Sequence, residues 1–336
     1  LHALAQIPGL YVPAVHDPKK TVHRRWIKTL DNFSGETAIV ADQTEFDSMY
    51  LVEVARGCGR HCRFCMAGYC FRPPRNRSIS SIRHGVEEAA KHKRKVGLVG
   101  AAVSDFPDME LLCSMLSAEG TGTSVASLRA DSTTEQLVQI LAASGHRTIT
   151  LAPEAGSEKL RRVINKGIDE EALLRTVAMA IRAGIPNVKL YVRIGLPEET
   201  EEDIEAIRDL ALTVMKCMQE NGRAGVLTLS INPFIPKPFT PFQWLPMTEQ
   251  SIVATRLKNI EKSLKGEKKI RVQFESLKEA YLQAVLARGD ERVGQILLQA
   301  HRFGGRKYWK PALKELKIDE ADYLYRMRAP DEILPW

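Results

Sequence analysis

Short apolar runs and longer helical patterns alternate along most of this chain. From residue 50 onward, runs rich in Val, Ile and Leu recur, and the stretches between them have the spacing of amphipathic helices. Such alternation favours βα units that build a parallel sheet. We predict six strands, at 49–54, 96–100, 123–127, 147–152, 187–194 and 226–232.

Five helices are predicted between these strands, at 80–93, 109–118, 134–143, 170–183 and 202–219. Glycines that can end a helix follow four of them, at Gly120, Gly145, Gly184 and Gly222. Six βα units predict an α/β fold, a partial (β/α)6 barrel of the TIM-like kind. In such barrels the functional groups lie on the loops that follow the strands.

The regions on either side of the predicted barrel, 49–245, have a different character. Residues 1–48 are predicted to be a connector, because Pro18 and two earlier prolines interrupt any periodic pattern. Four prolines within 233–244 predict an extended lip rather than a helix.

The last region, 246–336, is predicted to be a basic helical extension that begins with a helix at 252–264. Between residues 256 and 271, seven Lys and Arg residues stand against two acidic residues. The whole chain of 336 residues carries a net charge of +7, which permits a polyanionic partner.

The composition is that of an ordinary globular protein. Hydrophobic residues make up 44% and charged residues 26%, and no apolar run is long enough to cross a membrane. The chain begins at Leu1 without a secretory signal and has only six cysteines. We therefore expect a cytoplasmic protein.

Three of the six cysteines lie in one short loop after the first predicted strand. Cys58, Cys62 and Cys65 have the spacing Cys-x3-Cys-x2-Cys, with Phe64 directly before the third. Three thiolates this close can bind three irons of a four-iron cluster and leave the fourth iron open to a small molecule. The motif therefore predicts a catalytic [4Fe-4S] cluster.

Other interpretations of these cysteines stay open at this point. An odd trio does not suggest a disulfide framework. A structural zinc site would need a fourth ligand, which His61 or Cys70 could supply. Such a zinc module, or a non-catalytic iron–sulfur module, would bind metal without catalysis. We expect Cys70 to be inert, and Cys113 and Cys217 to lie in helices of the core.

The cysteine spacing with its aromatic residue resembles the signature of radical S-adenosylmethionine (SAM) enzymes, over residues 50 to about 245. The resemblance implies a radical SAM partial barrel, a [4Fe-4S] cluster, SAM chelated to the open iron, and an electron donor such as flavodoxin or ferredoxin. It also implies an activity: reductive cleavage of SAM to methionine and a 5′-deoxyadenosyl radical, which takes a hydrogen atom from a substrate.

The resemblance further implies eight contacts to SAM, from Phe64, Gly100, Ala101, Ser127, Glu154, Lys166, Gly195 and Leu196. The turn at Gly100 and Ala101 is similar to the glycine turn whose backbone receives SAM's amino group. Lys166, twelve residues after Glu154, stands where related branches carry a basic residue that pairs with SAM's carboxylate. Glu154 is expected to bond SAM or to orient this lysine.

The remaining contacts lie at two other strand ends. Ser127 stands where relatives often have a ribose-binding acid, and its hydroxyl can still bond a ribose. Gly195 and Leu196 belong to a strand exit that resembles one lying against adenine. Thr200, just beyond, is expected to cap the next helix.

Strand alternation places Lys189, Tyr191 and Arg193 on one face. If this face points into the barrel, Tyr191 and Arg193 are candidate catalytic residues that line the SAM or substrate cavity. A buried arginine needs an anionic partner, either a carboxylate or phosphate of a ligand or an acid of the barrel. The sequence leaves both open.

Two further basic segments are ambiguous. Arg161 and Arg162 are expected to lie on a solvated helix face. The stretch 71–77, next to the cysteines, either receives an anionic substrate or packs against acids of the barrel.

A longer pattern resembles one branch, the B12-binding-domain/radical SAM proteins. It is carried by Ala55-Arg-Gly-Cys58, Arg72-Pro-Pro-Arg-Asn-Arg-Ser78, Ala152-Pro-Glu-Ala-Gly-Ser157 and Pro236-Lys-Pro-Phe-Thr-Pro-Phe-Gln-Trp244. The resemblance implies a transferase that methylates a substrate radical from methylcobalamin. No Asp-x-His-x-x-Gly motif for cobalamin is present. We expect the chain to be a fragment that opens at the linker after a cobalamin domain.

A rival hypothesis is an RNA-modifying radical SAM enzyme of the methylthiotransferase or Elongator-like kind. The basic stretch at 256–271 and the net charge favour it. The absence of a second three-cysteine set and of a recognisable RNA-binding extension speaks against it.

Overall fold

The computed structural model describes residues 1–17, 19–46 and 49–336. Pro18, on which part of the connector prediction rests, lies outside the described residues, as do 47–48, the last two residues of that connector.

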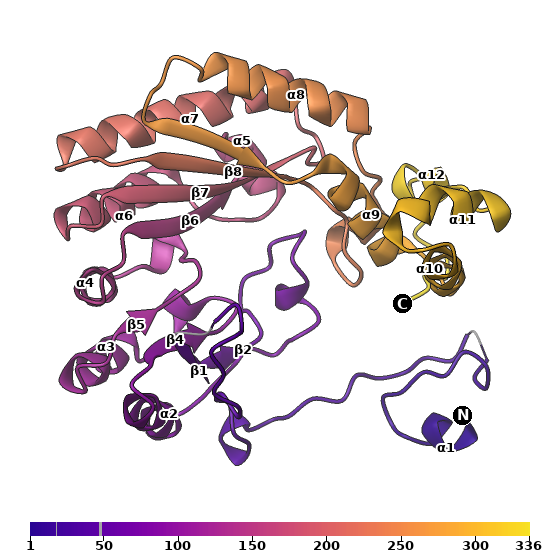
Figure 1. Cartoon of the computed structure of the whole chain (residues 1–336), viewed down its shortest axis with the longest axis horizontal. Coiled ribbons are helices and arrows are strands. Elements are labelled where there is room, and N and C mark those ends of the chain that lie inside the picture. The colour runs from indigo at the N-terminus through magenta and orange to yellow at the C-terminus, as the bar shows by residue number, and fades with distance from the viewer. Residues whose placement is uncertain (18, 47–48) are drawn as a thin grey trace.

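Among the described residues, seven parallel strands form two sheets that are joined into an open, partial barrel (Figure 1). The first sheet has the order β1 (Met49–Glu53), β4 (Lys95–Val99), β5 (Thr123–Ser124). The second has the order β6 (Thr148–Glu154), β7 (Asn187–Ile194), β8 (Leu227–Pro233), β9 (Ile270–Phe274). A parallel bridge between Leu128 and Leu151 connects them. The predicted α/β partial barrel is confirmed.

The five predicted helices are present, with ends that differ by at most two residues: α2 (Ile79–Lys91), α3 (Met109–Ala118), α4 (Glu135–Ala143), α6 (Glu170–Arg182) and α7 (Glu201–Glu220). The four glycines predicted to follow them all have positive φ, between 62° and 150°. These helices therefore end where a left-handed residue turns the chain back toward the sheet.

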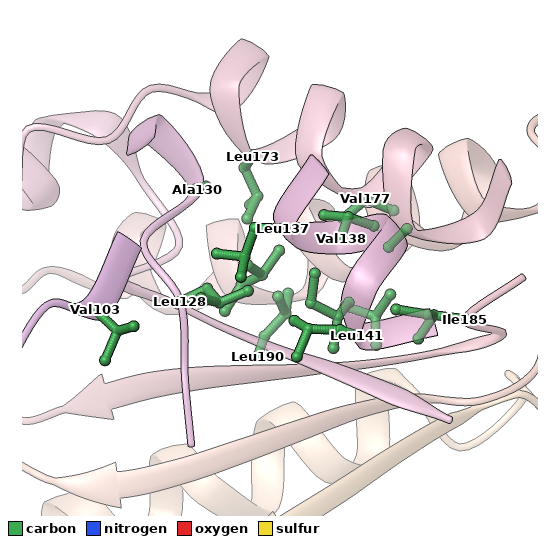
Figure 2. Packing of buried hydrophobic residues seen from close by; sticks show 14 of the residues in the cluster. Val103, Leu128, Ala130, Leu137, Val138, Leu141, Leu173, Val177, Ile185 and Leu190 are labelled. Atoms are coloured by element: carbon green, nitrogen blue, oxygen red, sulfur yellow. The ribbon is translucent and has the colours of Figure 1, made fainter. Parts of the chain in front are cut away.

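The main core lies between the strands and these helices. Leu137 and Leu141 of α4 and Leu173 of α6 lie against Leu190 of β7 (Figure 2). Every second residue of β7 is buried in this layer. The other residues of the strand therefore face the inside of the curved sheet.

The sequence predicts neither β9 nor the short length of β5. β9 follows two lysines, and of its five residues only Ile270 is fully buried, because it is the last strand of the sheet. Its polar pattern therefore resembles the end of a basic helix. β5 ends at Ser124, three residues earlier than predicted.

The predicted basic helix is α8 (Gln250–Ser263). Its apolar residues Val253, Leu257 and Ile260 join the main core, as does Ile270 of β9. This part of the region 246–336 therefore packs with the barrel.

Four further helices have a core of their own, and we call them the C-terminal module: α9 (Leu277–Arg288), α10 (Arg292–Arg302), α11 (Trp309–Glu315) and α12 (Glu320–Leu324). α9 starts three residues after β9 ends, so the module lies at the carboxyl end of the parallel strands (Figure 1). Ile235 of the lip and Met247, just after it, pack into the core of this module.

The lip is irregular up to residue 237, turns at 238–240, where Phe239 has a φ of +61°, and ends in a 3-10 turn, Pro241–Trp244. The N-terminal segment contains a short helix, α1 (His2–Ala5), and a 3-10 turn at Leu30–Asn32. Glu36 forms an antiparallel bridge with Val52 of β1. Within the part of the chain that the structure describes, no helix has the length and apolar character required to span a bilayer.

Candidate active site

The cysteine loop follows β1 at the carboxyl end of the barrel. It is closed at its base by a short antiparallel pair, β2 (Ala55–Arg56) with β3 (Arg75–Asn76). Gly57 has a φ of +85°, and a Cβ there would lie 2.1 Å from the carbonyl oxygen of Phe71. Only glycine therefore allows the two sides of the loop to approach this closely.

All three cysteines of the motif are free thiols, with Cys62 buried and Cys58 and Cys65 half-buried. Burial raises the pKa of the Cys62 thiol, while the positive charges of Lys166 and Arg129 act in the opposite direction. These cations would favour the thiolate that binds iron.

The donor set fits a [4Fe-4S] cluster, because three free thiols share one loop beside cationic groups. Among the described residues, no three His, Cys, Asp or Glu side chains surround a single ion position. A four-iron cluster does not require such convergence, since each cysteine binds a different iron.

Cys62 belongs to a small buried cluster whose members come from four parts of the chain. The other members are Phe64, Ala155, Leu160, Ile164, Leu196, Phe234 and Phe242. Backbone bonds hold the loop in this position. The Arg63 amide donates to the Ile164 carbonyl at 2.9 Å, and the Phe242 amide of the lip donates to the Arg63 carbonyl at 3.2 Å. The surroundings of Cys62 are thus apolar, whereas His61 and Arg63 on either side of it are exposed.

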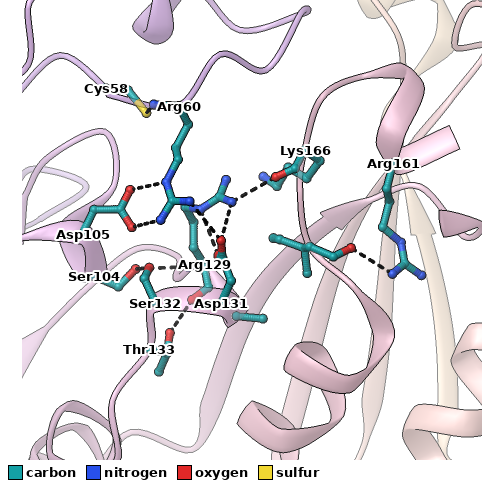
Figure 3. Close-up of polar contacts among 12 residues, drawn as sticks. Cys58, Arg60, Ser104, Asp105, Arg129, Asp131, Ser132, Thr133, Arg161 and Lys166 are labelled. Carbon is teal, nitrogen blue, oxygen red and sulfur yellow. Dashed lines mark hydrogen bonds and ion pairs between the residues drawn. The ribbon is translucent and has the colours of Figure 1, made fainter. Parts of the chain in front are cut away.

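A network of two arginines and two aspartates ties the loop to the ends of β4 and β5 (Figure 3). Arg60 donates to both carboxylate oxygens of Asp105, at 2.8 and 3.0 Å, and to Asp131 at 3.2 Å. Asp131 also accepts two hydrogen bonds from Arg129, at 3.0 and 2.8 Å. Burial would raise the pKa of Asp105, but the hydrogen bond from Arg60 holds this pKa below its usual value.

The same network reaches the predicted SAM-carboxylate residue. Arg129 donates to the backbone oxygen of Lys166 at 3.0 Å, and its own carbonyl accepts from Thr133 at 2.6 Å. The position of Lys166 is therefore coupled through Arg129 and Asp131 to that of the cysteine loop (Figure 3).

Glu154 lies between two cations at the end of β6. Its φ is +69°, an uncommon value for a residue with a side chain. One carboxylate oxygen lies 3.4 Å from Nζ of Lys166, and the other lies 2.9 Å from Nε of Arg193, which is not aligned for a hydrogen bond. The structure thus brings Glu154 and Lys166 together and gives Arg193 a carboxylate of the barrel.

Arg193 connects this pair to the cysteine loop, because its guanidinium lies 4.5 Å from the ring centre of Phe64. Lys189 stacks in a similar way over Tyr191, at 4.9 Å. All three predicted residues of β7 share the face away from the main core. Tyr191 and Arg193 therefore line the inside of the barrel.

Polar groups continue across this inner surface onto β8 and the lip. Asn232 lies directly beside Arg193 in the sheet, and its side-chain oxygen is buried without a hydrogen-bond partner. Burial and the nearby Arg193 lower the pKa of Lys237. The inside of the barrel near the cysteines is therefore polar and rich in cations.

Gly195 and Leu196 form a turn that is closed by Glu199. This carboxylate accepts from their two amides at 2.7 and 3.4 Å and lies 2.8 Å from Arg256 of α8. Burial raises the pKa of Glu199 to about 7, against the opposing effect of these donors and of the arginine. Leu196 packs beside Cys62, so this turn borders the cysteine loop.

Gly100, Ala101 and Ser127 lie at the strand ends where they are expected, directly after β4 and after β5. A Cβ at Gly100 would have its closest contact at 3.4 Å, an ordinary distance. Packing does not require glycine at this position, which leaves its small size available for a ligand. Ala101 and Ser127 are exposed.

Arg161 corrects one expectation. The expectation that Arg161 lies on a solvated helix face is wrong, because in α5 (Glu158–Val163) this residue is only 1% exposed. Its guanidinium donates to the carbonyls of Ala155, Gly156 and Ile168. Its neighbour Arg162 is exposed, as expected. Arg161 thus holds the turn that follows Glu154.

Within the basic stretch 71–77, Arg77 packs against an acid of the barrel, the second of the two interpretations, whereas Phe71, Pro73 and Pro74 are exposed. Arg77 is buried and pairs with Glu53 of β1 at 2.7 Å, and Arg75 donates to the backbone at Ile27 and Pro73. The Thr200 prediction is also confirmed, because Thr200 and Asp203 form a capping box at the start of α7.

Sequence reasoning missed Arg60, Asp105, Arg129, Asp131 and Glu199. Asp131 and Arg129 were visible as polar residues at the end of a strand, and Arg60 as a charge inside the cysteine motif. Their pairing spans up to 71 residues, so it has no local signal.

One family model matches the part of the chain that carries this site. The model of the radical SAM superfamily matches residues 52–211, which include the three cysteines, Glu154 and Arg193. Residues 52–211 thus match a radical SAM domain, the domain of a superfamily whose members are enzymes that use a [4Fe-4S] cluster and SAM.

Two curated relatives cover much of the chain. The uncharacterized protein MJ0966 of Methanocaldococcus jannaschii is 38% identical over 259 residues, which are 76% of this chain and 56% of that protein. The tRNA-2-methylthio-N(6)-dimethylallyladenosine synthase of Bdellovibrio bacteriovorus is 26% identical over 238 residues, 62% of this chain and 49% of that protein. The chain thus spans about half the length of the curated relatives it matches.

Among solved structures, Streptococcus suis SuiB bound to the precursor peptide SuiA resembles the chain with a TM-score of 0.50 and 15% sequence identity. The match covers 70% of this chain and 51% of that chain. This likeness concerns the fold alone.

Proposed function

We propose that the chain binds SAM against a [4Fe-4S] cluster held by Cys58, Cys62 and Cys65, and cleaves it reductively to abstract a hydrogen atom from a substrate. The observation that carries the proposal is the pair of cations, Lys166 and Arg193, that share the single carboxylate of Glu154 beside the cysteine loop. One positive charge is left over, and an incoming carboxylate would balance it.

Five of the predicted SAM contacts have a defined role in this proposal. Lys166 pairs with the carboxylate of SAM, and Glu154 orients the ammonium group of Lys166 for this contact. The open turn at Gly100 and Ala101 accepts the amino group, and Leu196 lies against the adenine. When bound, the cluster supplies the electron that breaks the C5′–S bond of SAM.

The apolar residues around Cys62 exclude water from the reaction. Phe64, Phe234 and Phe242 are all at least nine-tenths buried. We propose that Tyr191 and Arg193 orient the substrate on the inner surface of the barrel.

In a more specific version of this proposal, the substrate radical is methylated with methylcobalamin. This version rests on the resemblance of four sequence segments to the B12-binding branch. None of the described residues is assigned as a cobalamin ligand. The role of this cofactor is tested by adding it.

A second candidate function is the modification of RNA. Its support is that a curated relative, 26% identical, is named as a tRNA methylthio-adenosine synthase. Under this proposal the same SAM cleavage would act on a base of an RNA.

The test is anaerobic reconstitution with iron and sulfide, followed by dithionite and SAM, with and without methylcobalamin. We expect 5′-deoxyadenosine to form, and its formation to be lost in Cys62→Ala. Stimulation or methyl transfer by methylcobalamin would favour the methylating form. An intact cluster that yields no 5′-deoxyadenosine would contradict SAM cleavage by this chain alone.

A further inference from the structure

One basic surface is used by neither the barrel nor the proposed SAM site. It lies on α10, α11 and the turn between them, and we call it the α10–α11 surface: Arg302, Phe303, Lys307, Tyr308, Lys310, Lys314 and Lys317. From 302 to 317 there are six Lys and Arg residues and one acidic residue, Glu315. The net charge of +5 over these 16 residues equals that of the stretch at 256–271.

We propose that the α10–α11 surface binds RNA that presents unpaired bases. The inference deepens the second candidate function and rests on it only for what happens to the RNA after binding.

The cations of this surface are free to meet a ligand. Lys307, Lys310 and Lys314 are exposed and form no ion pair with a carboxylate among the residues that the structure describes. The one acid, Glu315, instead accepts a hydrogen bond from Gln299 of α10 at 2.9 Å. Net positive charge therefore remains on the surface, as required for contact with phosphates.

Two of the lysines project from the same side of α11. Lys310 and Lys314 are four residues apart, so they lie on one face of α11, about 6 Å apart along its axis. Trp309, Ala312 and Leu313 of the same helix are buried in the module. Because its apolar face is covered, α11 does not offer the two-sided character of a helix that lies in a membrane surface.

Aromatic rings at the edge of the charge distinguish RNA from other polyanions. Phe303 and Tyr308 pack edge to face: their ring centres are 6.2 Å apart with an interplanar angle of 60°. Lys307 lies 5.0 Å from the Tyr308 ring centre, and Phe303 is 37% exposed. Exposed rings beside cations are what unpaired bases stack on.

The turn between α10 and α11 holds these rings in place. Gly304 and Gly305 have φ values of +111° and +105°, and a Cβ at Gly304 would lie 3.1 Å from the Tyr308 ring. The glycines thus let the chain reverse while the two rings stay in contact.

The α10–α11 surface is connected to the active site through the lip. The C-terminal module packs on Ile235 and Met247, and Lys237 donates to Gln283 of α9 at 3.2 Å. Phe242, at the other end of the lip, bonds to the cysteine loop. The module that carries the α10–α11 surface therefore packs on the lip, whose other end contacts the cysteine loop.

The experiment measures binding of unfractionated tRNA to the reconstituted chain by fluorescence anisotropy between 50 and 200 mM salt, without SAM or reductant. We expect affinity to fall steeply with salt. The triple variant Lys307→Gln, Lys310→Gln, Lys314→Gln should bind roughly 10- to 100-fold more weakly, with a salt dependence reduced by about two to three units of log–log slope.

A matched control removes the same charge from α8 and its C-terminal end, in Lys258→Gln, Lys262→Gln, Lys265→Gln, all exposed in the structure. This control should bind tRNA nearly as the parent does. An equal loss in both triple variants would overturn the proposal, because it would mean that only net charge matters.

The ring is tested by Phe303→Ala, with heparin as a polyanion that has no bases. We expect weaker tRNA binding, an unchanged salt slope and unchanged heparin binding. Equal effects on tRNA and heparin, or none on tRNA, would overturn the assignment to RNA. Because SAM is absent from the assay, failure of SAM cleavage would leave this result intact.

Discussion

The cations of this molecule fall into two groups with opposite surroundings. Inside the barrel, Arg60, Arg129 and Lys166 each lie within 3.4 Å of a carboxylate. On the C-terminal module, Lys310 and Lys314 have no such partner among the described residues. A paired cation is held in one position, whereas an unpaired one stays available to a partner. The inner group therefore shapes a site, and the outer group provides a surface.

The largest effect should come from the centre of the inner group. Cys62→Ala removes the buried thiol around which the apolar residues and the two cations gather. We expect loss of the brown colour of the cluster and of SAM cleavage. Absorbance, iron content and 5′-deoxyadenosine formation measure this.

Cys70→Ala is the matched control for Cys62→Ala. Cys70 is a free, half-buried thiol five residues beyond the motif. The cluster should survive its removal. Loss of metal in both variants would revive the zinc interpretation in which Cys70 is a ligand.

Breaking the inner ion pairs should destabilise the fold. Asp131→Ala leaves Arg60 and Arg129 without a shared carboxylate, and we expect a loss of about 2–3 kcal/mol in the free energy of unfolding, since both partners are only partly exposed. Denaturant titration measures this. Asp209→Ala, which removes an exposed acid of α7, should change little. Equal losses would mean that the network adds no more than a surface pair.

Lys166→Ala should weaken SAM binding while the cluster stays in place. Loss of a charge-assisted contact predicts an affinity about 10- to 100-fold lower. Equilibrium dialysis of SAM with the reconstituted variant measures it, and Lys216→Ala, on an exposed position of α7, serves as the control. If the lysine variant binds SAM normally, Lys166 is not the carboxylate partner.

Glu199 should make stability depend on pH in an unusual direction. Its pKa is about 7 in the fold against a usual value of 4.5, so the folded chain holds a proton that the unfolded chain releases. Stability should therefore fall as the pH rises from about 4.5 to 7, by up to about 1.4 kcal/mol per pH unit.

Glu199→Gln should flatten this part of the profile, because the amide does not titrate. Unfolding curves at several pH values compare the two proteins. An unchanged slope in the variant would show that another group is responsible.

The smallest effect should come from the outer group. Lys310→Gln with Lys314→Gln breaks no ion pair, so we expect a change within about 0.5 kcal/mol in the free energy of unfolding. A larger loss would mean that these lysines support the module itself, and it would weaken the contrast between the two groups.

The sequence predicts much of the frame of this molecule, because local patterns carry it. Alternation predicts the buried face of β7, the four glycines predict helix ends, and the cysteine spacing indicates the superfamily. The residues predicted to contact SAM lie on the strand ends and loops around the carboxyl end of the barrel, but their contacts with SAM stay predictions.

What the sequence does not predict depends on partners far along the chain. Arg161 has the pattern of an exposed helix residue, yet three carbonyls take its guanidinium into the interior. Asp105 and Asp131 become ion-pair partners of the cysteine loop only when folding brings Arg60 between them. β9 lacks a clear alternation because one of its sides has no neighbouring strand.

The open, partial barrel leaves the edges of β1 and β9 without a neighbouring strand, and each edge is protected against pairing with other molecules in a different way. Beside β1, the Thr37 amide donates to the Leu51 carbonyl at 3.0 Å, and the Glu53 amide donates to the Gly35 carbonyl at 2.7 Å. On β9, Arg271 and Gln273 are exposed, and charged or polar side chains discourage edge-to-edge pairing. The N-terminal segment is therefore a guard against aggregation as well as a connector. A chain shortened past residue 37 would keep the cysteine loop and expose a strand that recruits its own copies.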